Sequence, residues 1–217
     1  TLSIYTRFSN DKDVFPSGES RMLSRELADL IQTQIVDDVR AQYEDRWPRR
    51  GLWDRSYSES RTPEIPSMLL ELLSHQNLAD MRYGADPRFR FVVSRAIYKA
   101  MLRFQSQRYG FDYVVQPLPV NSFAAVLEDK GGDKPCVRLS WKPVDDPTEP
   151  TASPESFIVY YNVEGGEAGH RVVSPKEGTS VTMVIEADAI YSFKVAAVNK
   201  GGVSFPSEVL ALCDKGK

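Results

Sequence analysis

Glu71 is the carboxylate of this sequence whose position best suits chemistry. It ends the apolar run SMLLE, residues 67–71, and the sites of α/β proteins lie at the carboxyl ends of their strands. Partial burial at such an edge would suit this carboxylate for proton transfer. The alternative is a strand-end glutamate that pairs with one of the neighbouring arginines.

A metal site within these residues is not expected. His75 lies four residues after Glu71, so on a helix the two side chains could share a metal ion. A zinc site needs about three protein ligands, and neither His170 nor the scattered carboxylates offers an evident third. Cys136 and Cys213 fall in predicted strands, and two cysteines so far apart favour free thiols over a disulfide framework.

Arginine and aromatic side chains are interleaved between residues 46 and 61. Aromatic rings can stack on sugar rings while guanidinium groups hold carboxylates. Acidic residues lie among them, so internal ion pairing is the alternative. We take Arg50, Trp53 and Arg61 as candidates for substrate binding. The whole set is Arg46, Trp47, Arg49, Arg50, Trp53, Arg55, Tyr57 and Arg61.

Several classes of function find no support in the sequence. It has no Gly-x-Ser-x-Gly turn and no glycine-rich phosphate-binding loop. A net charge of -3 argues against a nucleic-acid partner, which requires concentrated lysine and arginine. No apolar run approaches the roughly 18 to 20 residues of a membrane span. The first residues do not resemble a signal peptide, and without an initiator methionine the chain looks like a piece of a longer protein.

The first half of the chain, residues 1–112, predicts an α/β domain. Residues 2–8 alternate like a half-buried strand, and apolar residues at helical spacing predict an amphipathic helix over residues 19–44. An irregular connection with a short strand follows. The run SMLLEL, residues 67–72, is typical of a strand buried on both faces in a parallel sheet.

A second helix in this half has clear boundary signals. Asp86 suits the N-cap, and Pro87 suits the first helical position, where its missing N–H is not needed. Gly110 is placed to end the helix. Two long helices alternating with two or three strands predict an α/β layer with a thin core.

The second half, residues 122–217, predicts an all-β immunoglobulin-like sandwich. Seven short alternating runs are separated by turn residues. Trp141 would fill the centre, and Tyr191 is placed like a tyrosine corner, whose hydroxyl bonds nearby backbone. The runs VRLSWKP, FIVYYNV and YSFKVAAVNKGGVSFPSE resemble a fibronectin type III domain. Residues 113–121, with two prolines, are the expected linker.

The order of features in residues 1–108 resembles the C-terminal half of the zinc-dependent N-acetylmuramoyl-L-alanine amidases. A strand and a helix opened by GESRMLSRELADLIQ precede an RRG step, RTPEIPSMLLELL and a closing helix, DPRFRFVVSRAIYKAML. Pro66, Glu71 and Asn77 fall on the family's proline, glutamate and asparagine. Where the family has Gly-Phe after the glutamate, this chain has Leu72 and Leu73. The resemblance implies a partial amidase-like sheet.

This resemblance also implies an activity. The family cleaves the amide between N-acetylmuramic acid and L-alanine in peptidoglycan with a zinc-bound water, and Glu71 would be the general base. Asn77 joins Arg50, Trp53 and Arg61 as a substrate-binding candidate. The family's zinc ligands, two histidines and a glutamate, precede the matched region. The resemblance therefore implies zinc in the parent enzyme, an inactive isolated piece, a peptidoglycan partner and a periplasmic or extracellular location at a bacterial cell envelope.

Two other functions remain open from the sequence. A non-catalytic glycan-binding or adhesion module would use the arginine and tryptophan segment, with Glu71 a relic. A lyase for an acidic polysaccharide such as xanthan would need a tyrosine or histidine base beside an arginine. His75, Tyr57 and Arg61 supply these residue types, although nothing in their spacing supports a lyase.

Overall fold

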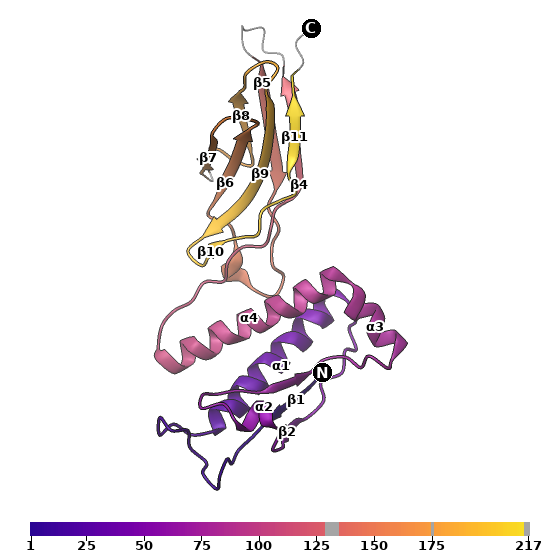
Figure 1. Ribbon diagram of the computed structural model, residues 1–217, viewed down its shortest axis with the longest axis vertical. Helices are drawn as coiled ribbons and strands as arrows, with labels where there is room; N and C mark the ends of the chain where they lie inside the picture. Colours follow the sequence, from indigo (N-terminus) through magenta and orange to yellow (C-terminus); the bar gives the residue numbers. More distant parts are fainter. Residues whose placement is uncertain (129–134, 175, 215–217) are drawn as a thin grey trace. The chain divides into compact units, whose positions relative to one another are not determined.

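The computed structural model describes residues 1–128, 135–174 and 176–214. The chain divides into two compact units, Thr1–Tyr113 and Val114–Lys217, called unit 1 and unit 2 below (Figure 1). Unit 1 combines helices with a small sheet, and the described part of unit 2 is built almost entirely of strands.

The sheet of unit 1 has three short strands in the order β2-β1-β3. They are β1 (Leu2–Tyr5), β2 (Leu52–Asp54) and β3 (Leu69–Glu71). β1 runs parallel to β2 but antiparallel to β3, with Leu2 opposite Glu71. The expected parallel strand buried on both faces is therefore wrong, since Leu69 and Leu70 are half-buried and Glu71 is exposed. The last residue of β3 therefore lies at the same end of the sheet as the first residues of β1 and β2.

Two long helices, α1 (Met22–Gln42) and α4 (Pro87–Tyr109), form most of the core of unit 1. α1 packs against both α4 and β1 (Figure 1). The boundary signals of α4 are confirmed: the Asp86 side chain accepts a hydrogen bond from the Arg88 N–H at 2.8 Å, and Gly110 has a φ of 68°. Apolar side chains of both helices form the core, namely Ile31, Ile35, Val36, Val39, Phe89, Val93, Ala96 and Ala100.

A fully buried ion pair joins the two long helices. The Lys99 ammonium of α4 lies 2.7 Å from the Asp38 carboxylate of α1, and neither side chain is more than 2% exposed. Gln34 donates a further hydrogen bond to the Asp38 carboxylate at 2.9 Å. The core of unit 1 therefore contains charge as well as apolar side chains.

Two short helices complete unit 1. They are α2 (Ser58–Arg61) and α3 (Leu78–Ala85). The sequence did not predict α3, which has no buried residue and so lacks the apolar stripe that marks an amphipathic helix. Asn77 is its N-cap, and the Asn77 side-chain oxygen accepts from the N–H of Ala79 at 2.9 Å and of Asp80 at 3.4 Å.

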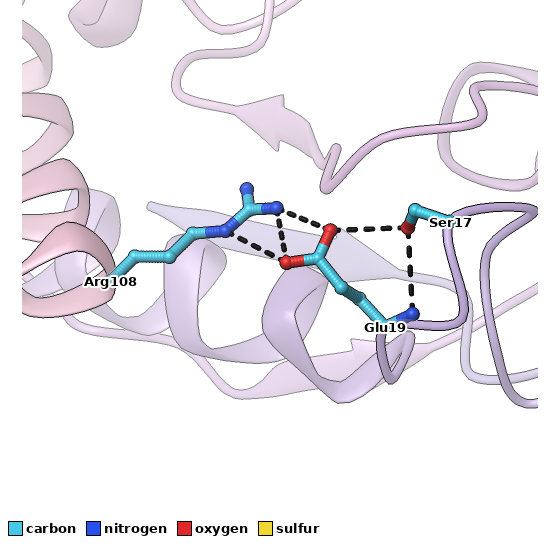
Figure 2. A network of polar contacts seen from close by, with 3 residues as sticks. All are labelled: Ser17, Glu19 and Arg108. Atoms are coloured by element: carbon cyan, nitrogen blue, oxygen red, sulfur yellow. Dashed lines mark hydrogen bonds and ion pairs between the residues drawn. The ribbon is translucent and has the colours of Figure 1, made fainter.

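The segment between β1 and α1 is an ordered loop. Asn10 and Asp11 have φ of 52° and 57°, and Ser9 and Lys12 exchange two backbone hydrogen bonds across this tight turn. Further along, the Glu19 carboxylate accepts hydrogen bonds from Arg108, in the last turn of α4, and from Ser17 (Figure 2). A forked carboxylate–guanidinium contact of this kind ties the loop to α4.

Unit 2 is a sandwich of two antiparallel sheets, as the sequence predicts. One sheet has the order β4-β5-β8, and the other has β10-β9-β6-β7 with β11 also paired to β9. The strands of the first sheet are β4 (Asn121–Glu128), β5 (Cys136–Lys142) and β8 (Ser180–Val184). Those of the second are β6 (Ser156–Val163), β7 (Ala168–Val173), β9 (Ile190–Asn199), β10 (Gly202–Val203) and β11 (Leu210–Cys213). A short 3-10 helix spans Pro150–Ala152.

The predicted landmarks of the sandwich are in place. Trp141 is buried in the core, with its ring centroid 5.3 Å from that of Phe157. The Tyr191 hydroxyl accepts a hydrogen bond from the Glu186 N–H at 3.2 Å, which is the tyrosine corner. In segment 113–121, expected as the linker, Val115 and Val120 are buried. Val120 belongs to the core of the sandwich.

Candidate functional site

Glu71 and Arg50, two of the predicted site residues, line one pocket of unit 1. The pocket has a volume of about 250 Å³ and lies at the end of the sheet where β3 finishes. Trp47, Leu73 and Asp80 also line it. The structure thus brings together a carboxylate and a guanidinium that are separated by twenty residues in the sequence.

The backbone of Arg50 is fixed by a buried glutamine from α1. The Gln32 side-chain amide donates hydrogen bonds to the carbonyl oxygens of Thr1, at 2.7 Å, and of Arg50, at 2.9 Å. The Arg50 N–H in turn donates to the Thr1 carbonyl at 2.9 Å. Gln32 is fully buried, so these bonds are shielded from water and hold the start of β2 beside the start of β1.

The Glu71 carboxylate is exposed and unpaired. Its backbone position is set by the pairing of β3 with β1, and no hydrogen bond or ion pair joins its side chain to another described residue. Neither the partial burial expected for Glu71 nor the alternative of an arginine pair is found. Its carboxylate is available to a ligand that enters the pocket.

The other polar groups around this pocket have structural partners. Asp80 accepts a hydrogen bond from the Ser74 N–H at 2.8 Å, and Asn77 caps α3. Thr1 also lines the pocket. Asn77, a predicted substrate-binding residue, is not among the residues that line the pocket.

Trp53 forms an exposed aromatic surface beside two guanidinium groups. The Trp53 side chain is 42% exposed. The guanidinium carbons of Arg50 and Arg55 lie 5.8 Å and 5.7 Å from the centroid of its ring, within the range of a cation–π interaction. Gly51 leaves room for the indole, because a Cβ at that position would lie 3.3 Å from the indole nitrogen. Arg50 therefore belongs to both the pocket and this surface.

The remaining members of the arginine and aromatic segment have other partners. Trp47 is buried, and its indole N–H donates to the Thr1 hydroxyl at 2.8 Å. Arg49 forms an ion pair with Asp29. Arg61, a predicted substrate-binding residue, donates to the Ser56 hydroxyl at 2.9 Å and does not line the pocket. The segment is thus divided between an exposed surface and internal contacts.

Two hypotheses from the sequence, a metal ion shared by Glu71 and His75 and a lyase that uses His75 and Tyr57, gain no support from the geometry. His75 lies in a turn before α3, so it does not share a helix with Glu71. His75 and Tyr57 do not line the pocket that contains Glu71 and Arg50. Within residues 1–128, 135–174 and 176–214, no three histidine, cysteine, aspartate or glutamate side chains gather into a possible metal site. Cys136 and Cys213 do not form a disulfide, as predicted.

No helix in the described part of the chain is long and apolar enough to cross a membrane.

Comparison with known proteins gives matches among solved structures alone. No family model matches the chain, and no curated protein does. The structure of a myokine is 16% identical, with a TM-score of 0.37, and the match covers 46% of this chain and 98% of the other. The FN5 domain of Drosophila Lar is 17% identical, with a TM-score of 0.36 and coverage of 46% and 99%. A fibronectin type III domain of human collagen XX is 16% identical, with a TM-score of 0.34 and coverage of 47% and 98%.

These matches are similarities of fold, and none of them bears on the amidase resemblance of unit 1. The assignment of unit 2 rests on its own strands: two antiparallel sheets in the order β4-β5-β8 and β10-β9-β6-β7, a buried tryptophan and a tyrosine corner. Unit 2 has the fibronectin type III fold.

Proposed function

We propose that this chain is part of a cell-envelope hydrolase of the N-acetylmuramoyl-L-alanine amidase type, which cuts the amide between N-acetylmuramic acid and L-alanine in peptidoglycan. The observation that supports this proposal is the pocket shared by Glu71 and Arg50. An unpaired carboxylate can transfer a proton to and from the reacting groups. A guanidinium in the same pocket can hold a carboxylate of the substrate.

In the proposed reaction Glu71 acts as base and then as acid. It takes a proton from a water molecule while the water oxygen attacks the carbonyl carbon of the amide. It returns that proton to the nitrogen of L-alanine as the carbon–nitrogen bond breaks. The second proton of the water leaves the new carboxyl group and is taken up by the amine, so the products are a carboxylate on the muramic acid and an ammonium group on the peptide. Arg50 positions the peptide through one of its carboxylates.

The zinc ion that the amidase resemblance implies does not fit the residues described. They contain no group of three potential ligands, whereas a catalytic zinc site has about three protein ligands. The proposal therefore places zinc, and the side chains that bind it, in the parent protein outside these residues. In this proposal unit 2 is a spacer or positioner, and the fibronectin type III fold indicates no substrate because it occurs with many functions.

The test is Glu71→Gln in the parent protein. The amide side chain cannot accept the proton from water, so cleavage should fall by about 10²- to 10⁴-fold, while muropeptide binding remains. Release of peptides with new amino termini from peptidoglycan measures the cleavage. Glu26→Gln is the matched control, because Glu26 is also exposed but lies on α1. Unchanged turnover in Glu71→Gln would return Glu71 to a structural role.

A second candidate is a glycan-binding module without catalysis, which the exposed Trp53 surface favours. A sugar ring can stack on the indole while Arg50 and Arg55 hold its carboxylates. Trp53→Ala should then weaken binding of muropeptides to the 217-residue chain by about tenfold or more. Titration calorimetry measures this affinity.

A matched control for Trp53→Ala is Phe8→Ala. Phe8 is also exposed and has an arginine over its ring, with the Arg7 guanidinium carbon 5.0 Å from the centroid. Loss of affinity in both variants would indicate unspecific binding. Binding that depends on Trp53, combined with no cleavage of peptidoglycan by the parent protein, would favour the binding module over the hydrolase.

A further inference from the structure

A second pocket of unit 1 contains a buried arginine without an acidic partner. The pocket has a volume of about 490 Å³ and lies where the loop after β1 meets the segment before β3. Arg21 lines it and is only 4% exposed. Arg21 was not among the site residues predicted from the sequence. The pocket adjoins the loop that follows β1, whereas Glu71 pairs with Leu2 at the start of β1.

The guanidinium of Arg21 is only partly satisfied. Its Nη2 donates to the Arg61 carbonyl at 3.1 Å. Its Nε and Nη1 have no hydrogen-bond partner, and no carboxylate among the described residues pairs with it. The guanidinium carbon lies 4.6 Å from the centroid of the Phe15 ring, and stacking of this kind does not use the in-plane N–H groups, of which those on Nε and Nη1 are buried. A buried charge without a partner is costly in free energy, and an anion in the pocket would offset that cost.

The loop holds Arg21 in this position. The Arg21 N–H donates to the Asp13 carbonyl at 2.8 Å, and Phe15 exchanges backbone bonds with Gly18 and Glu19. The contact of Glu19 with Arg108 then anchors the loop to α4 (Figure 2). The wall of the pocket is therefore built before a ligand arrives, which reduces the entropy lost on binding.

The remaining side chains indicate the class of ligand. Lys12 and Arg21 supply two positive charges against the one negative charge of Glu64, so the lining has a net charge of one positive. Glu64 and Lys12 are both exposed, whereas Arg21 is buried. Val14, Phe15 and Pro16 add apolar surface, and the volume is in the range of small-molecule sites. A bare inorganic ion would use neither the volume nor the apolar wall.

We infer that this pocket binds a small organic carboxylate, whose charged group pairs with Arg21 and Lys12 and whose apolar part contacts Val14 and Phe15. This inference is independent of the proposed hydrolase, because it involves neither Glu71 nor Arg50. Arginine is suited to this role, since its planar fork matches the geometry of a carboxylate.

The experiment titrates the 217-residue chain with N-acetyl-L-alanine and follows the backbone amide resonances of residues 9–18. N-acetyl-L-alanine amide, which has the same shape without the charge, is the matched ligand, and inorganic phosphate is the third probe. We expect saturable shifts with the acid and none with the amide. Arg21→Met should weaken binding of the acid by about 10- to 100-fold, the range for a lost hydrogen bond to a charged group.

Two further variants keep the test decisive. Lys12→Ala changes an exposed turn residue and should weaken binding without affecting the fold, even if Arg21→Met folds poorly. Arg25→Met, on an exposed face of α1, should leave binding unchanged. Equal affinity for acid and amide, unaltered binding in both Arg21→Met and Lys12→Ala, binding of phosphate alone, or no shift with any probe would each overturn the inference.

Discussion

Units 1 and 2 differ in how they satisfy their buried polar groups. In unit 2 the buried Asn199 side chain donates to the carbonyls of Val115 and Thr151, and the hydroxyls of Ser204 and Ser207 accept from strand β9. Among the described residues of unit 2, the Trp141 indole N–H is the buried side-chain group without a partner. In the described part of unit 1, by contrast, Ser3 and Gln32 each have one buried polar atom without a partner, and Arg21 has two.

This difference indicates where a ligand would be recognised. A sandwich whose buried polar groups are mostly satisfied gains little from a further partner. Unit 1 has an unpaired carboxylate in one pocket, Glu71, and an incompletely bonded guanidinium in another, Arg21. A buried polar group without a partner, such as the Arg21 guanidinium, requires an explanation in a native structure, and our account assigns binding and chemistry to unit 1 and spacing to unit 2.

The largest effect on stability should come from Lys99→Met in unit 1. This change leaves the Asp38 carboxylate buried beside an apolar side chain in place of its ammonium partner. Loss of one member of a buried pair costs about 3 to 5 kcal/mol. Hydrogen exchange of the α1 and α4 amides measures the free energy of opening of unit 1 separately from unit 2.

Arg90→Met is the control for this change, because Arg90 lies on the same helix but is exposed. If Lys99→Met costs no more than Arg90→Met, the buried pair does not stabilise unit 1. The difference between unit 1, whose core contains a charged pair, and unit 2, whose core cluster is apolar, would then have no measurable effect on stability.

A smaller effect is expected for Tyr191→Phe in unit 2. The ring stays in the core, beside Phe193 at a centroid distance of 5.8 Å, while the hydrogen bond from the Glu186 N–H is lost. The free energy of unfolding of unit 2 should fall by about 1 kcal/mol, as judged by exchange of the β9 amides. A loss as large as that of Lys99→Met would contradict the view that unit 2 depends mainly on apolar packing.

The sequence predicted unit 2 better than unit 1 for a physical reason. In a sandwich the alternation of side chains and the turn residues act locally, so all seven predicted runs are strands. The strand that ends at Glu71 was predicted, but its expected parallel pairing was wrong, because an apolar run does not encode which way it pairs. α3 was missed because its residues are all at least partly exposed, although Asn77 followed by Asp80 resembles a helix start.

Prediction of the candidate site was likewise partial. Glu71 and Arg50 were both named from the sequence and line one pocket, but Asn77 and Arg61 have structural contacts away from it. Arg21 could not have been found, because it lies in a polar stretch that looks exposed. Its burial arises when the loop of residues 9–18 folds over the start of α1, a tertiary effect without a local signal in the sequence.

Cleavage of peptidoglycan by Glu71→Gln, measured beside its muropeptide affinity in the parent protein, tests the central claim most directly. Our account predicts that cleavage falls by about 10²-fold or more, while the affinity stays within about twofold because Arg50 and Trp53 are intact. Cleavage at the rate of the unaltered protein would contradict it and leave Glu71 as an exposed residue at the end of β3.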